Sequence, residues 1–116
     1  QRQTEDGPQL DHISRDEEGF LLDPSEWHAG LIEPIAREME IEMSTEQTLV
    51  VWFVRDYFET NQTVPEARTL LKYLRAELGD ERGTRRYLYS LFPYGYGQQA
   101  CKIAGMSKPR KLMLDV

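Results

Sequence analysis

Apolar positions recur along the chain at helical spacing and predict a mostly helical fold. Asp23 is a suitable N-cap and Pro24 a suitable first residue for the first helix. An apolar stripe at spacing four then follows, made of Trp27, Leu31, Ile35 and Met39. Because Pro34 falls inside this stripe, we expect a kink or a break there.

Four further helices are expected, over residues 44–62, 63–79, 84–92 and 98–105. In the first, Ser44 and Gln47 form a capping box. Its many apolar residues favour a central, buried position, although their β-branched character also suits a strand. Trp27, Trp52 and Phe53 are expected in the core. In the helix over 63–79, Pro65 is expected at the first position, with Gly79 ending the helix.

The expected organisation is a single domain over residues 1–116. Residues 1–9 are expected to be loose, and 10–22 to form a small β-hairpin that turns at Gly19. The helical core spans 23–105, and 106–116 form a flexible C-terminal arm. The predicted fold class is therefore mostly α (α+β). It contains helix–turn–helix-like pairs, 64–78 with 84–92 and 84–92 with 98–104.

Charge is distributed unevenly between the two halves of the chain. Residues 1–60 hold 4 basic and 15 acidic residues, and residues 61–116 hold 10 basic and 5 acidic residues. The basic half could attract an acidic protein surface, RNA or a small anion, or the two halves could simply attract each other. The stretch "RGTRRYLY" (82–89), together with Lys102 and Arg110, resembles a nucleic-acid-binding patch. The net charge of −6 favours an ordinary solvated face. The acidic runs "DEEG" and "EMEIEM" are interpreted as turn and surface residues.

Composition gives no indication of a metal site, a bound cofactor or a membrane-spanning segment. His12 and His28 match no zinc spacing, and a single cysteine can form no internal disulfide. We expect no cofactor. No apolar run reaches the length of a membrane span, and a lone thiol suits a reducing compartment, so a cytoplasmic location is expected.

Cys101 is the main candidate for chemistry. Cations near it in the sequence could stabilise a thiolate: Arg85, Arg86, Lys102, Lys108, Arg110 and Lys111. Of these, Arg85, Arg86, Lys102, Lys108 and Arg110 are the candidates for binding an anion or a partner. The alternative is an inert core residue, since free cysteine is among the most buried residue types.

Three stretches resemble the DsrC/TusE family of sulfur-handling proteins: "DEEGFLLDPSEW", "ARTLLKYL" and "RRYLYSLFPYGYGQQACKIAGMSKP". The resemblance runs from about Asp16 to Pro109. It implies a helical core, an N-terminal hairpin, a C-terminal arm and partners of the sulfur-relay or sulfite-reductase type. In the sulfite-reductase type it also implies two cysteines, of which Cys101 matches the first.

The chain departs from this pattern at the arm cysteine, where Leu112 stands eleven positions after Cys101. The usual carrier cycle therefore cannot be transferred to this chain. Three roles remain for Cys101: a mixed disulfide with a partner, a persulfide, or a Cys101-linked homodimer under oxidation. A regulatory or adaptor protein that binds partners, or nucleic acid, without carrying sulfur is the alternative.

Overall fold

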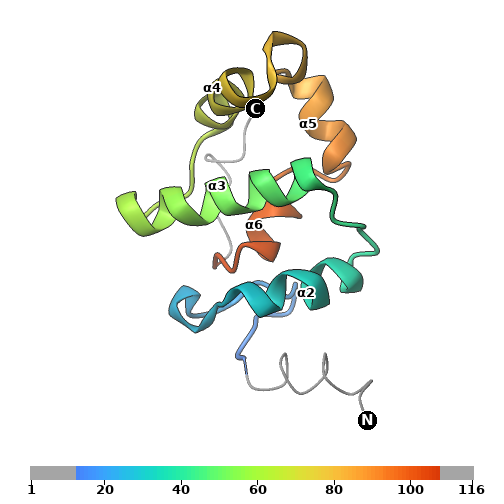
Figure 1. The fold of residues 1–116 in the computed structure, drawn as a ribbon. Coiled ribbons are helices and arrows are strands. Elements are labelled where there is room, and N and C mark those ends of the chain that lie inside the picture. The colour runs from blue at the N-terminus through green and yellow to red at the C-terminus, as the bar shows by residue number, and fades with distance from the viewer. Residues whose placement is uncertain (1–12, 108–116) are drawn as a thin grey trace.

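The computed structural model describes residues 13–107, which form a helical domain (Figure 1). The α-helices are α2 (Ile32–Glu38), α3 (Thr45–Asn61), α4 (Ala67–Leu78), α5 (Arg85–Leu91) and α6 (Ala100–Ile103). Three 3₁₀ turns accompany them: η2 (Pro24–Glu26), η3 (Ala29–Leu31) and η4 (Asp80–Arg82). The mostly helical prediction is confirmed.

Helix α6 is the innermost element. It lies between α2 and α3 and packs against both, while α4 and α5 lie on the other side of α3 (Figure 1). Four residues of α6 and its following turn are fully buried: Ala100, Cys101, Ile103 and Ala104. The helix is shorter than the predicted 98–105, and Gly105 follows it with φ +80°.

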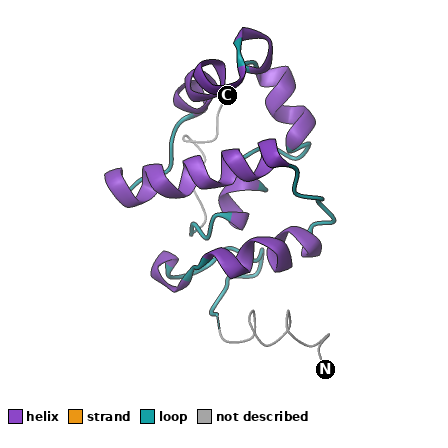
Figure 2. Cartoon of the chain, in the orientation of Figure 1, coloured by secondary structure: helices purple, strands orange, loops and turns teal. Residues whose placement is uncertain are grey.

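The predicted β-hairpin is wrong for the part that the structure describes. Residues 13–107 contain no strand (Figure 2), only an isolated bridge between Arg15 and Leu21. The turn itself is present, with Gly19 at φ +96°. The Asp16 carboxylate accepts from the backbone N–H groups of Glu18 and Phe20, which fixes a local turn instead of a ladder. Phe20 and Leu21 are both buried, so the alternation that a strand needs is missing.

The first predicted helix is divided, and the kink at Pro34 is wrong. Asp23 caps only the short η2 turn, and extended backbone at Trp27 and His28 separates it from η3. Helix α2 begins at Ile32, so Pro34 lies in its first turn, where its missing N–H would have no partner inside the helix. At the other end of α2, Glu40 takes φ +59° and starts the loop to α3.

The predicted capping box of α3 is confirmed. The Ser44 hydroxyl accepts from the Gln47 N–H, and the Gln47 side chain accepts from the Ser44 N–H. One face of α3 is buried, with Val50, Val51 and Val54 in the core. Trp52 is 37% exposed, so its predicted core position is wrong. Helix α4 begins after Glu66, two residues beyond the expected Pro65.

Candidate functional site around Cys101

Cys101 lies in the hydrophobic core. Its exposed fraction is 0%, and it packs in the cluster that also contains Tyr96, Ala100 and Met106. The Cys101 N–H donates to the Tyr96 carbonyl at 2.8 Å, and its carbonyl accepts from the Met106 N–H at 3.1 Å. The Tyr96 hydroxyl, also buried, donates to the Pro65 carbonyl at 3.0 Å. The thiol is therefore enclosed by residues that precede α6 in the sequence and by residues that follow it.

Burial keeps the thiol neutral. It raises the pKa of Cys101 from its ordinary 9.0 to about 12. At pH 7 such a thiol is ionised in only about one molecule in 10⁵. A thiolate is the attacking species in sulfur chemistry, so Cys101 is unreactive in the conformation that the structure describes.

The cations near Cys101 in the sequence lie on different elements. The Lys102 Nζ lies 5.0 Å from the centre of the Phe20 ring. It also helps to lower the pKa of Glu38, although the larger cause is the hydrogen bond from Arg15. Arg85 and Arg86 are exposed in the first turn of α5. Lys108, Arg110 and Lys111 lie outside the described residues.

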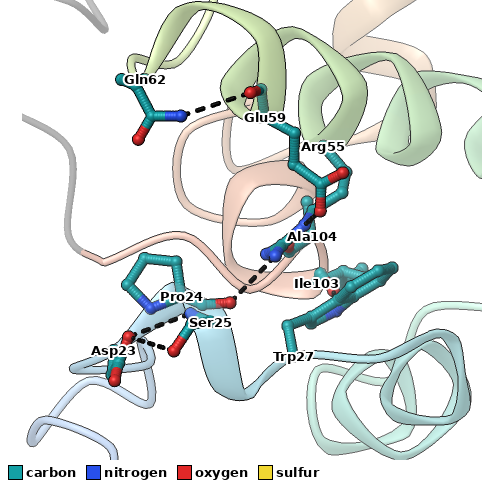
Figure 3. Close-up of polar contacts among 9 residues, drawn as sticks. All are labelled: Asp23, Pro24, Ser25, Trp27, Arg55, Glu59, Gln62, Ile103 and Ala104. Carbon is teal, nitrogen blue, oxygen red and sulfur yellow. Dashed lines mark hydrogen bonds and ion pairs between the residues drawn. The ribbon is translucent and has the colours of Figure 1, made fainter.

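Two side chains hold the end of α6 in place (Figure 3). Arg55, on α3, is 5% exposed and donates to the carbonyls of Ala104 at 3.2 Å and Pro24 at 3.0 Å. Its Nε donates to Glu59 at 2.8 Å, and its guanidinium lies 4.7 Å from the centre of the Trp27 ring. The Trp27 indole N–H donates to the Ile103 carbonyl at 2.8 Å. We call Arg55 and Trp27 the α6 clamp, because they satisfy two carbonyls at the end of this helix.

Gly105 completes the contact between α6 and the clamp. A Cβ at this position would lie 2.3 Å from Trp27 Cδ1, far inside van der Waals contact. The positive φ of Gly105 is a second reason for glycine here. The ring of Trp27 therefore rests directly on the backbone of the turn after α6.

Two buried polar residues near Cys101 were not predicted from the sequence. Arg55 is the only basic residue of α3, and Glu59 follows four residues later, a spacing that could have drawn attention to it. Gln99 is 4% exposed, and its Oε1 accepts from the Tyr94 N–H at 3.1 Å. Nothing in the sequence distinguishes Gln99 from its exposed neighbour Gln98.

Neither a metal site nor a membrane-spanning helix is found among the residues that the structure describes. No group of histidine, cysteine, aspartate and glutamate residues suitable for a metal ion occurs within residues 13–107. None of the helices in this range is long and apolar enough to cross a membrane.

The fold and the α6 segment define a class of protein: the chain belongs to the DsrC-like family. The family model described as "DsrC like protein" matches residues 9–113. The sulfurtransferase TusE of Salmonella typhimurium is 44% identical over 99 residues, which cover 85% of this chain and 91% of that protein. The same values hold for the sulfurtransferase TusE of Escherichia coli K12. The family prediction is confirmed.

Solved structures agree with these relatives. DsrC of Allochromatium vinosum superposes with a TM-score of 0.74 and 40% identity, covering 84% of this chain and 88% of that one. The oxidised gamma-subunit of the dissimilatory sulfite reductase (DsrC) from Archaeoglobus fulgidus gives 0.77 and 34%, covering 84% and 89%. The helical domain is thus shared with the DsrC proteins.

Proposed function

We propose that this protein acts in a sulfur relay by binding partner proteins, with Cys101 as its sulfur acceptor. The similarity to the TusE sulfurtransferases, over 99 residues at 44% identity, is the observation that carries the proposal. Cys101 is the only cysteine of the chain and lies inside the family match. The partners are proteins of the sulfur-relay or sulfite-reductase type, in the cytoplasm. The nucleic-acid-binding alternative receives no support from these relatives.

The proposed step is a sulfane transfer without net oxidation. The Cys101 thiolate attacks the outer sulfur of a partner's persulfide, the partner's S–S bond breaks, and its thiolate leaves. The products are a Cys101 persulfide and a partner thiol, so sulfur and protons balance. Because Cys101 is 0% exposed, the step requires α6 to move out of its clamp first.

A second function, partner binding without sulfur exchange, is favoured by the burial of the same thiol. A neutral thiol with a pKa of about 12 suits a packing residue. In that case the protein is an adaptor or regulator that presents the DsrC-like surface and leaves sulfur on its partners.

Intact mass separates the two functions. We expect the reduced protein, incubated with a partner sulfurtransferase loaded as a persulfide, to gain the mass of one sulfur atom. A Cys101→Ser variant should gain none, and a reductant should reverse the gain. Urea-unfolded protein serves as the control for intrinsic thiol reactivity. Sulfur uptake only after unfolding would eliminate the acceptor role and leave the adaptor function.

A further inference from the structure

Two adjacent hollows beside α6 share part of their lining. One, of about 520 Å³, is lined by Met39, Tyr94, Gln98, Gln99 and Lys102. The other, of about 430 Å³, shares Met39, Tyr94 and Gln99 with it and continues to Glu40, Glu42 and Leu91. We call this surface the Gln99 groove. It connects the Cys101 helix with the loop between α2 and α3.

Gln99 supplies an unused donor in the wall of this groove. Only 4% of Gln99 is exposed, and its Oε1 accepts a hydrogen bond from the Tyr94 N–H. That bond determines which end of the amide is oxygen, so Nε2 is the free end. Within residues 13–107, Nε2 donates to no acceptor. Buried donors are almost always paired, so this one is available to an acceptor oxygen from outside the fold, from water or from a ligand that displaces it.

Gln47, which lines the same groove, shows the contrast. Its Oε1 accepts from the Ser44 N–H, and its Nε2 donates to the Leu91 carbonyl at 2.8 Å. Both ends of that amide are therefore used inside the fold. Gln99 has the same chemistry and a buried position, but only one of its ends is used.

The charges on the groove select among ligands that carry an acceptor oxygen. Glu40 and Glu42 are exposed and form no ion pair within the described residues. Lys102 lines only the first hollow, and its Nζ lies over the Phe20 ring and acts on Glu38. The hollow with Glu40 and Glu42 is therefore acidic, which repels phosphate and favours lysine or arginine. Half-buried Met39 and Leu91 between them offer apolar contact. An extended peptide supplies all three features: a backbone carbonyl, a basic side chain and an apolar side chain.

We propose that the Gln99 groove docks a basic, extended segment of a partner protein, with a backbone carbonyl of the segment accepting from Gln99 Nε2. The segment's basic side chains meet Glu40 and Glu42, and an apolar side chain packs on Met39 and Leu91. The inference rests on the proposed partner binding but does not require sulfur transfer. Docking here places the partner against the helix that carries Cys101.

The probe is a short synthetic peptide of alternating lysine and valine, fluorescein-labelled, with binding followed by fluorescence anisotropy. We expect Gln99→Met, which keeps the length of the side chain, adds no charge and removes the donor, to weaken binding about tenfold. Gln62→Met, at the end of α3, makes the same replacement outside the groove and should have little effect. The side-chain NH₂ signal of Gln99 in a ¹⁵N spectrum should shift when the peptide binds. An unchanged signal, or equal affinity in the two variants, would overturn the proposal.

The charge contribution has its own matched pair of variants. The double variant Glu40→Gln with Glu42→Gln should weaken binding about fivefold at low salt. Glu77→Gln with Glu81→Gln removes the same charge from exposed positions outside the groove and should change little. A glutamate–valine peptide that binds as tightly as the lysine–valine peptide would eliminate a basic occupant. A lysine–serine peptide that binds equally well would eliminate the apolar contact.

Two further experiments distinguish a partner segment from the chain's own C-terminus as the occupant of the groove, and docking from sulfur transfer. If deletion of residues 108–116 tightens peptide binding severalfold, the chain's own C-terminus occupies the groove and the partner assignment is wrong. A Cys101→Ser variant should bind the peptide normally. Normal peptide binding together with no sulfur uptake would refute the acceptor role while supporting the docking surface.

Discussion

Cys101 links the stability of the domain to pH. Its pKa is raised from 9.0 to about 12 in the folded state by burial. Below pH 9 the thiol is protonated in both states, and its contribution to stability is fully present. As pH rises from 9 toward 12, the unfolded chain loses the proton while the folded one keeps it. Stability therefore falls by up to about 1.4 kcal/mol per pH unit.

Urea unfolding of the wild type and of Cys101→Ala tests this linkage. The free-energy difference between the two proteins should be constant from pH 6 to pH 8 and shift by about 1 kcal/mol against the wild type by pH 10. The pKa of Tyr96 is raised by burial and also by Cys101, so both proteins should carry Tyr96→Phe to leave the thiol as the group compared. Parallel pH profiles would show that the thiol is hydrated in the folded state.

Sequence reasoning at the residue scale identified Cys101 but not its surroundings. Charges close in sequence predicted an environment that favours a thiolate, whereas the structure encloses the sulfur in apolar side chains. Lys102 is adjacent in sequence, yet its Nζ lies over the Phe20 ring. Successive residues on a helix point about 100° apart, so adjacency in sequence does not place two side chains together. The contact from Arg55 to Ala104 spans 49 residues, and the bond between Gln99 and Tyr94 depends on how the turn between them folds, so neither contact could be predicted from the sequence.

At the scale of elements, local signals succeeded where a side chain bonds to nearby backbone. The Ser44–Gln47 capping box predicted the start of α3, because both partners lie within four residues. The prediction of a hairpin failed because the Phe20 N–H, which a β-ladder would pair with a backbone carbonyl, donates to the Asp16 carboxylate instead. The kink at Pro34 failed because the proline sits where a helix tolerates it. Helix α2 starts at Ile32, and its N-cap residue Leu31 makes no side-chain capping bond, so no capping signal in the sequence marks this start.

The α6 clamp is predicted to control access to Cys101. Arg55→Met removes the donors to the Ala104 and Pro24 carbonyls and should cost about 2–4 kcal/mol of unfolding free energy. Trp27→Phe removes the indole N–H and part of the ring that packs on Gly105 and Arg55, and should cost about 1–3 kcal/mol. Both should speed the labelling of Cys101 by an aromatic disulfide under native conditions, because the end of α6 opens locally.

Arg68→Met is the matched control for the clamp, since Arg68 is exposed on α4 and carries the same charge. It should change neither stability nor labelling beyond error. Labelling rates that track global unfolding alone, in urea series of all three variants, would contradict a local opening.

For the whole molecule, the uneven charge distribution has a partial structural counterpart. Arg82 from the basic half pairs with Glu46 from the acidic half, and Lys102 acts on Glu38. Such surface pairs stabilise the fold by less than about 1 kcal/mol each, so they contribute little to the stability of the domain. The hydrophobic cluster, which draws residues from Leu21 to Met106, holds the domain together.

The burial of Cys101 in this cluster also determines how a disulfide-linked dimer can form. A disulfide requires two sulfur atoms about 2 Å apart, and a thiol with 0% exposure cannot meet a second copy without opening. We predict that mild oxidation of the native protein yields dimer slowly, at the rate of α6 opening, and that Arg55→Met yields it faster. Non-reducing gels over time measure both rates, with Cys101→Ser as the blank. Dimer that forms at once in the wild type would mean that α6 is open before oxidation, and the clamp would then have no role in protecting the thiol.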